Sequence, residues 1–207
     1  MAPETCLILA SKSPRRYYLL KKAGLVVEVH PSGIDESSFS GTEPADTVLA
    51  LARAKTLDVA ARYPARWVLG ADTVVNIDDR ILGKPSTPAD ARAMLTRLSG
   101  KTHQVFTGFC ICRQDQNRFF SDTVVTDVTF KTLSEAEIDW YIRSGEPFDK
   151  AGAYAIQGLG TFLVRSINGS YTNVVGLPVC EVIEILIREG VMALEETVHH
   201  SHLTGEG

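Results

Sequence analysis

Short apolar runs alternate with segments of helical periodicity along most of this chain of 207 residues. The runs have the length of buried strands and cover residues 7–10, 26–29, 67–75, 81–82, 103–112, 118–131 and 161–167. The helical segments cover residues 14–24, 44–63, 88–100, 134–145 and 178–189. Ser13-Pro14 and Thr87-Pro88 are typical helix starts, and Ser134 with Glu137 predicts a capping box. The alternation predicts an α/β fold.

The length of the chain predicts one domain, or one domain divided into two lobes by a cleft. Neither a repeat nor a linker interrupts it, so we expect a single domain over residues 1–194. Residues 195–207 are polar and lack periodicity, which predicts a frayed tail. With 44% hydrophobic and 22% charged residues, the composition is that of a soluble globular protein and argues against disorder, collagen and coiled coil.

Charge and hydropathy exclude several classes of partner. The net charge of -4 and the absence of interleaved aromatic and basic stretches argue against nucleic acid. No apolar run is long enough to span a bilayer and the first residues lack signal-peptide character, so we expect no membrane. The four cysteines form no C-x-x-C pair, and Cys110 and Cys112 fall on one face of a strand. We interpret them as core residues of a cytoplasmic protein.

Three cations surround the expected start of the first helix, in the segment Ser11-Lys12-Ser13-Pro14-Arg15-Arg16. A helix N-terminus already carries partial positive charge and unpaired N–H groups, so each cation there is unfavourable by about 0.3–1 kcal/mol. A bound anion would remove both penalties, and phosphate is the natural candidate. A solvated charge cluster explains the same residues, and the segment alone leaves both interpretations open. The sequence contains neither a P-loop pattern nor a complete dinucleotide-binding fingerprint.

Candidate acidic residues follow two of the expected strands. Asp72 follows the apolar residues 67–69, with Gly70 and Ala71 between, at the kind of strand end where open α/β sheets bind ligands. Asp35 and Glu36 lie in a polar loop after another strand. Converging carboxylates with nearby lysines, here Lys55 and Lys84, suit Mg²⁺ or Mn²⁺ on a polyphosphate. Taken singly, each of these residues is also explained as an ordinary turn or surface residue.

Five stretches between Leu7 and Arg188 form an ordered series of motifs. They are Leu9-Ala10-Ser11-x-Ser13-Pro14-Arg15-Arg16, Gly70-Ala71-Asp72-Thr73-Val74-Val75 with Gly83-Lys84-Pro85, Met94 to Gly108, Asp149 to Gly158, and Ile167 to Pro178. In this order they resemble the motifs of the Maf (septum-formation-type) nucleotide pyrophosphatases. The resemblance covers nearly the whole chain, and agreement by chance at five motifs is negligible.

The resemblance implies a fold, a reaction and a set of site residues. The fold is a mixed, elongated and twisted sheet flanked by helices, with two lobes around a central cleft, as in Maf proteins and inosine triphosphatases. The reaction is hydrolysis of a nucleoside triphosphate to the monophosphate and pyrophosphate with a divalent cation, in a protein that is usually a homodimer. The family's general base falls on Asp72, its metal site on Glu36 and Asp72, and its phosphate-binding residues on Ser11, Arg15, Arg16, Lys55 and Lys84. Lys12 departs from the small residue that is common there.

Three positions point to a subtype of the family. Arg15, Thr73 and Gln157 match the residues that mark the pyrimidine type, which acts on dTTP and UTP. Modified pyrimidine nucleotides are a further candidate substrate. The alternative function is a nucleotide-binding regulator of cell division or septum formation with slow hydrolysis. A pure sensor need not keep a base beside its cations, so the intact set of Asp72, Glu36 and the lysines favours the enzyme.

Overall fold

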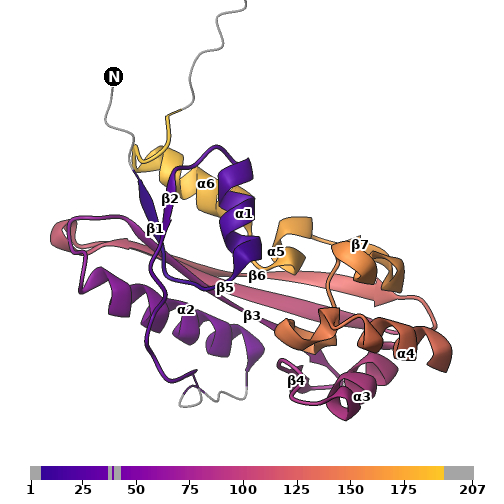
Figure 1. The fold of residues 1–207 in the computed structure, drawn as a ribbon. Helices are drawn as coiled ribbons and strands as arrows, with labels where there is room; N and C mark the ends of the chain where they lie inside the picture. Colours follow the sequence, from indigo (N-terminus) through magenta and orange to yellow (C-terminus); the bar gives the residue numbers. More distant parts are fainter. Residues whose placement is uncertain (1–5, 37–38, 40–42, 194–207) are drawn as a thin grey trace, which may run out of the picture.

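The computed structural model describes residues 6–36, 39 and 43–193, and within them a seven-stranded sheet runs through the molecule (Figure 1). The strand order is β2-β1-β3-β5-β6-β7, and β4 pairs with β3. The strands are β1 (Leu7–Leu9), β2 (Val27–Val29), β3 (Val68–Ile77), β4 (Arg80–Leu82), β5 (Thr102–Arg113), β6 (Arg118–Phe130) and β7 (Val164–Asn168). β1 pairs in parallel with β2 and β3, whereas the other pairs are antiparallel. The sheet is therefore mixed and elongated, as predicted.

Helices flank this sheet on both faces. They are α1 (Pro14–Lys22), α2 (Pro44–Ala60), α3 (Pro88–Leu98), α4 (Glu135–Arg143), α5 (Tyr171–Val175) and α6 (Val179–Arg188), with short 3₁₀ turns η2 (Gln114–Gln116), η3 (Glu146–Asp149), η4 (Ala151–Ala153) and η5 (Gly158–Leu163). Each of the expected helix starts is confirmed: Ser13, Thr87 and Ser134 cap their helices, the last two in capping boxes. These caps satisfy N–H groups that a helix start would otherwise leave unpaired.

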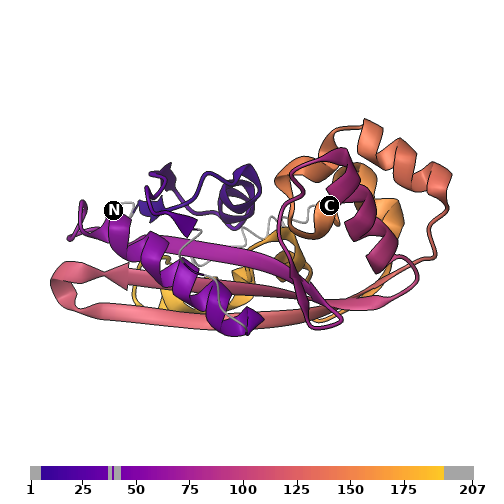
Figure 2. The same cartoon turned by 90° about the horizontal axis from the view of Figure 1, so that it is seen from below.

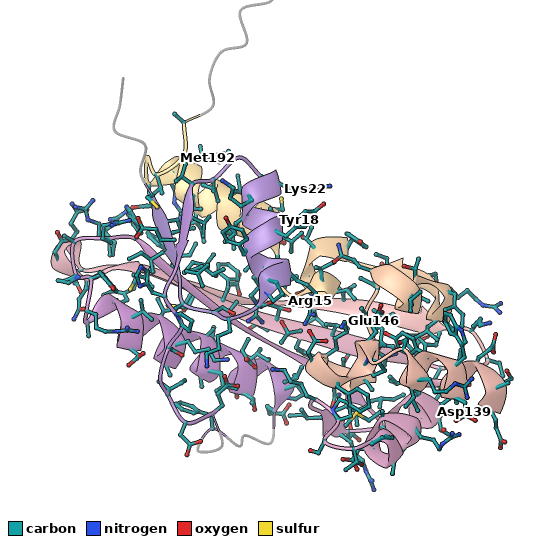
Figure 3. The ribbon with its side chains drawn as sticks, in the orientation of Figure 1. Arg15, Tyr18, Lys22, Asp139, Glu146 and Met192 are labelled. Carbon is teal, nitrogen blue, oxygen red and sulfur yellow. The ribbon has the colours of Figure 1, made fainter. Side chains whose placement is uncertain are left out.

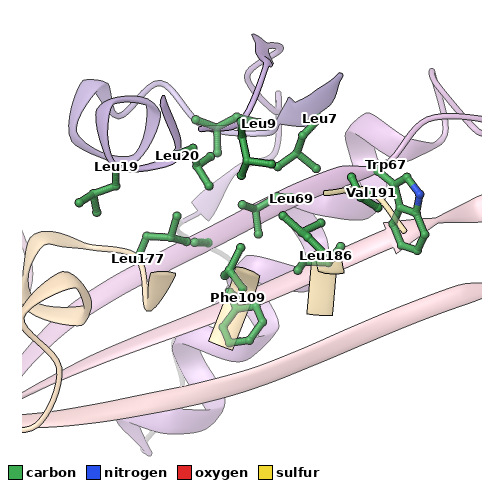
Figure 4. Close-up of a cluster of buried hydrophobic side chains, with 14 of the residues drawn as sticks. Leu7, Leu9, Leu19, Leu20, Trp67, Leu69, Phe109, Leu177, Leu186 and Val191 are labelled. Atoms are coloured by element: carbon green, nitrogen blue, oxygen red, sulfur yellow. The ribbon is translucent and has the colours of Figure 1, made fainter. Parts of the chain in front are cut away.

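Two hydrophobic cores on the long strands divide the molecule into two lobes. The first core packs α1 and α6 against β1, β3 and β5 through side chains such as Leu20, Leu69 and Leu186 (Figure 4). The second lies at the other end of the strands, where α3 and α4 cover the sheet (Figure 2), and it includes side chains such as Val105. Since β3, β5 and β6 run through both lobes, they fix the position of one lobe relative to the other.

The edge of β3 is open between the lobes. β1 pairs with Val68 and Leu69, and β4 pairs with β3 only from Val75 onward. Both lie on the edge of β3 away from β5, and no strand among the described residues pairs with that edge from Gly70 to Val74. Side chains on this stretch can meet a ligand without crossing another strand.

Helix α2 approaches the sheet at two glycines. A Cβ at Gly70 would lie 2.4 Å from Thr56 Oγ1, and a Cβ at Gly108 would lie 2.5 Å from the carbonyl carbon of Val48. Gly108 pairs with Asp72 across the sheet, so the close contact lies directly beside this carboxylate. Only glycine permits such an approach of two backbones.

Some predicted boundaries were wrong. Asp72, expected at the end of a strand, lies within β3, because the apolar residues Val74 and Val75 continue the strand to Ile77. The strand expected from Thr161 begins at Val164, because η5 occupies the preceding residues and the Thr161 hydroxyl donates a hydrogen bond to the Gly158 carbonyl at 2.7 Å. The helix Tyr171–Val175 was not predicted, and its five residues are too few for a periodic pattern. The tail predicted at 195–207 lies outside the described residues, so the division of the chain at residue 194 stays a prediction.

The cysteines match the interpretation of Cys110 and Cys112 as core residues. Both are buried in β5, and all four cysteines of the chain are free. No helix among the described residues is long and apolar enough to cross a membrane.

His103 is buried in the second core and makes the stability of the fold depend on pH. Its Nε2 lies 2.7 Å from Tyr154 Oη, and its Nδ1 has no hydrogen-bond partner among the described residues. Burial lowers the pKa of His103 to about 4, so the folded protein holds it neutral while the unfolded chain takes up a proton near pH 6.5. We predict that the free energy of unfolding falls by on the order of 3 kcal/mol from pH 7.5 to pH 4 on this account.

Urea unfolding at a series of pH values measures this dependence. His103→Gln keeps a hydrogen-bonding group toward Tyr154 but does not titrate, so the slope between pH 6.5 and 4.5 should flatten in this variant. An equal slope in the variant and the wild type would contradict the assignment to His103.

Candidate active site

A cleft of about 580 Å³ lies between the lobes, beside the open stretch of β3. The residues proposed from the sequence as site residues, together with Lys12, all line it: Ser11, Lys12, Arg15, Arg16, Glu36, Lys55, Asp72, Thr73, Lys84 and Gln157. They come from the turn before α1, the first turn of α1, the loop after β2, α2, β3, the turn after β4 and the segment before η5. Asp35, the neighbouring loop carboxylate, is not among the lining residues. The fold therefore gathers residues that are scattered over the sequence.

A second hollow, of about 660 Å³, lies over α4 and η5. Its lining is mainly apolar and includes Trp140, Leu159 and Phe162. It has the larger volume but only one charged side chain, Glu137, so the chemistry of the residues favours the cleft.

Lys55 joins the two carboxylates of the cleft. Its Nζ lies 2.7 Å from Asp72 Oδ1 and 2.8 Å from Glu36 Oε1. The Asp72 side chain is 13% exposed and Glu36 is 58% exposed, so Asp72 is the one held at the cleft floor. The Lys55 ammonium therefore bridges the two carboxylates. Within the described residues Asp72 Oδ2 has no hydrogen bond and remains available to a ligand or water.

Glu36 is ionised at neutral pH for electrostatic reasons. Partial burial raises the pKa of its carboxyl group, but the hydrogen bond from Lys55 and the charges of Lys55, Lys84 and Arg16 outweigh burial and lower the pKa below its ordinary value. Lys84 itself makes no hydrogen bond or ion pair with the described residues. Its ammonium can therefore pair with a ligand in the cleft.

Arg16 is buried and braces the cleft wall. Its guanidinium donates to the Gly176 carbonyl at 2.7 Å, to Ser11 Oγ at 3.1 Å and to Thr73 Oγ1 at 3.0 Å. Burial lowers the pKa of Arg16, and the nearby Asp72 carboxylate opposes this effect. The sequence assigned Arg16 to phosphate alone, but these three contacts indicate that it also joins α1 to β3 and to the loop before α6.

Arg15 points across the cleft to the second lobe (Figure 3). Its Nη1 donates to Asp149 Oδ2 at 2.7 Å and its Nη2 to the Asp149 carbonyl at 3.3 Å. Burial raises the pKa of Asp149, but hydrogen bonds from Lys150 and Arg15 outweigh it and lower the pKa. Asp149 and Lys150 also line the cleft, and no role was predicted for them although they begin one of the motifs. A pair separated by 134 residues leaves no local pattern by which to find it.

Thr73 and Gln157 occupy different surroundings in the cleft. The Thr73 hydroxyl accepts from Arg16 and lies 2.9 Å from Thr107 Oγ1, so the cleft wall already holds it. The Gln157 side chain lines the cleft and makes no hydrogen bond with the described residues. Its amide is therefore free to bond with a ligand.

The donors of the cleft suit a hard divalent cation in part. No group of three or more His, Cys, Asp or Glu side chains converges within the described part of the chain. Asp72 and Glu36 nevertheless lie close enough together for Lys55 Nζ to contact both carboxylates. Mg²⁺ is commonly held by one or two carboxylates while phosphates and water complete its shell. The two residues are compatible with that arrangement when a polyphosphate is present.

The fold is a mixed α/β fold, and the cleft between its two lobes is lined by both basic and acidic side chains. The chain belongs to the Maf-like protein family, whose model matches residues 6–189.

Curated relatives agree with this membership. A protein of Geotalea uraniireducens is 49% identical over 93% of this chain and 99% of its own, and one of Myxococcus xanthus is 48% identical over 92% and 95%. A protein of Pyrococcus furiosus is 43% identical over 87% of this chain and 93% of its own. All three are named dTTP/UTP pyrophosphatase. A solved HAM1 protein from Coxiella burnetii aligns over 60% of this chain and 72% of its own at 14% identity and a TM-score of 0.39, which is a partial likeness.

Proposed function

We propose that this protein hydrolyses dTTP and UTP to the monophosphate and pyrophosphate. The observation that carries the proposal is the Asp72 carboxylate, which lies at the open edge of β3 beside Lys55 and within a cleft lined by Arg15, Arg16 and Lys84. The relatives that share the family bear the name of this activity. The cleft supplies positive charge for a triphosphate and a carboxylate for water.

The cations bind and orient the triphosphate. Lys84 is free to pair with phosphate oxygens, and Arg15 can exchange the Asp149 carboxylate for a phosphate that carries more charge. Ser11 and the start of α1 lie on the same side, where the partial positive charge of the helix favours an anion. Neutralising the β- and γ-phosphates stabilises pyrophosphate as the leaving group.

Asp72 activates the attacking water. Lys55 occupies Oδ1, so Oδ2 accepts the proton as the water oxygen attacks the α-phosphorus. The bond from the α-phosphorus to the bridging oxygen breaks, and that oxygen leaves with pyrophosphate. Lys55 keeps the carboxylate oriented throughout.

A divalent cation, Mg²⁺ or Mn²⁺, completes the proposed site. Glu36 and Asp72 would hold it, and it would supply a Lewis acid for the phosphate oxygens. Lys55 holds both carboxylates at the cleft, where such a cation would meet them. That the protein acts as a homodimer in the cytoplasm, without nucleic acid or membrane, stays a prediction.

Gln157, together with Arg15 and Thr73, selects the nucleobase of the substrate. A side-chain amide has one donor face and one acceptor, which match the alternating edge of uracil and thymine. Thr73 is small and held by Arg16, so it limits the pocket. A base that lacks the matching groups leaves the amide unpaired and is rejected.

Replacing Asp72 tests which phosphorus the water attacks and whether Asp72 is the general base. We predict that Asp72→Asn lowers kcat on dTTP by about 10²–10⁴-fold, because the amide cannot take the proton. Released pyrophosphate is measured with Mg²⁺ present, and Asp115→Asn, in an exposed ion pair with Arg113, is the matched control. In ¹⁸O water the label should enter the monophosphate. Orthophosphate as first product, or near-normal turnover by Asp72→Asn, would contradict the mechanism.

Replacing Gln157 tests how the protein selects the nucleobase of its substrate. Gln157→Glu exchanges a donor for a second acceptor, so kcat/KM for dTTP and UTP should fall by roughly 5- to 150-fold while the low turnover of GTP and 7-methyl-GTP changes less. Gln116→Glu, in an exposed turn between β5 and β6, should change neither. Equal wild-type kcat/KM on dTTP and 7-methyl-GTP would rule out the assigned selectivity.

A further inference from the structure

The segment that carries Gln157 is held from behind by two side chains of the second lobe. Glu146 Oε2 accepts a hydrogen bond from Leu159 N at 2.9 Å, and Oε1 accepts one from Gly160 N at 2.9 Å. The Tyr141 hydroxyl donates to Glu146 Oε1 at 2.8 Å and accepts from Ala155 N at 3.2 Å. These bonds fix the backbone on both sides of Gln157.

Glycines allow the backbone to lie this close to the two side chains. Gly158 has a φ of +70°, and a Cβ there would lie 2.6 Å from Glu146 Oε2. A Cβ at Gly160 would lie 2.7 Å from Tyr141 Oη and 2.3 Å from the Ala155 carbonyl oxygen. The segment is thus shaped to wrap around the carboxylate.

The charge states suit these hydrogen bonds. Tyr141 is fully buried, and burial raises its pKa, so its hydroxyl remains a donor. Burial raises the pKa of Glu146, but hydrogen bonds from Leu159, Gly160 and Tyr141 outweigh it and lower the pKa. The carboxylate therefore stays an acceptor at both oxygens at neutral pH.

Glu146 also contacts the segment that meets Arg15. Its backbone carbonyl accepts from Lys150 Nζ at 2.6 Å, and Lys150 follows Asp149, the partner of Arg15. Arg15 and Glu146 lie on facing lobes in Figure 3. One residue outside the lining of the cleft thereby supports two segments that line it.

We propose that Glu146, assisted by Tyr141, is a positioning residue that sets base selection by holding Gln157 in the orientation that reads the pyrimidine. This inference rests on the proposed function. It assigns no contact with the nucleotide to Glu146. Its effect passes through the backbone of residues 155–160.

The proposal predicts a loss of selectivity when the carboxylate becomes an amide. Glu146→Gln has one acceptor oxygen, so the N–H of either Leu159 or Gly160 would face an NH₂ group. We expect the ratio of kcat/KM for dTTP to that for GTP to fall about 10-fold or more, with GTP turnover little changed. Tyr141→Phe removes only the partner of Ala155 N and the third bond to Glu146, so the ratio should fall less.

A double-mutant cycle separates positioning from a general loss of structure. In a Gln157→Ala background, Glu146→Gln should leave the dTTP/GTP ratio unchanged within about twofold, because the group that it positions is absent. Glu189→Gln is the matched control, since that carboxylate also accepts two hydrogen bonds, from Arg118 at 2.7 and 2.9 Å, at the far end of α6. An unchanged ratio in Glu146→Gln, or full additivity with Gln157→Ala, would overturn the proposal.

Two further measurements separate this test from a failure to fold and from a failure of the proposed hydrolysis. If Glu146→Gln does not fold, as judged by its circular dichroism and Tm, the same cycle with Tyr141→Phe decides. If the wild type releases no pyrophosphate from dTTP, the proposed function fails. The Kd ratio of dTTP to GTP from calorimetry then replaces kcat/KM, with the same expected and contradicting outcomes.

Discussion

Helix α2 and strands β3 and β5 lie so close together that neither Gly70 nor Gly108 has room for a Cβ. Asp72 lies on the same face of β3 as Gly70, because side chains two residues apart point to one side of a sheet. Lys55, on α2, reaches this carboxylate at 2.7 Å. The close packing of helix on sheet therefore sets the geometry of the ion pair around which the cleft is built.

The open edge of β3 exposes this ion pair to the cleft between the lobes. β1 and β4 leave the strand unpaired between the lobes, and each lobe contributes charges to the gap. Arg16 is fixed by three protein acceptors, whereas neighbouring Arg15 pairs with Asp149 across the cleft. The two adjacent arginines therefore differ in role: Arg16 supports the wall of the cleft, and Arg15 presents a charge with which a polyphosphate can pair. The lobes keep their spacing because the same long strands run through both cores.

Local patterns predicted most elements, since capping residues such as Ser13 and Ser134 act within one turn of a helix. The sequence also identified residues that the fold brings to one cleft, and their roles came from resemblance to a family rather than from spacing. What it missed depends on distance along the chain. Asp149 meets Arg15 only after folding, and η5 replaces the start of an expected strand because its backbone follows Glu146. Periodicity carries no information on such contacts.

Gly108→Ala tests most directly whether the close packing of α2 on the sheet sets the Lys55–Asp72 geometry that hydrolysis requires. The added methyl group must displace the backbone of α2 at Val48 and shift Lys55 from Asp72, and small displacements in a catalytic site can cost about 10²-fold in rate. Pyrophosphate release from dTTP is measured on folded protein, with Gly33→Ala, which has open space around its Cβ, as the control. We predict that kcat falls at least about tenfold in Gly108→Ala and stays within about twofold in Gly33→Ala. Wild-type kcat in folded Gly108→Ala would contradict the account.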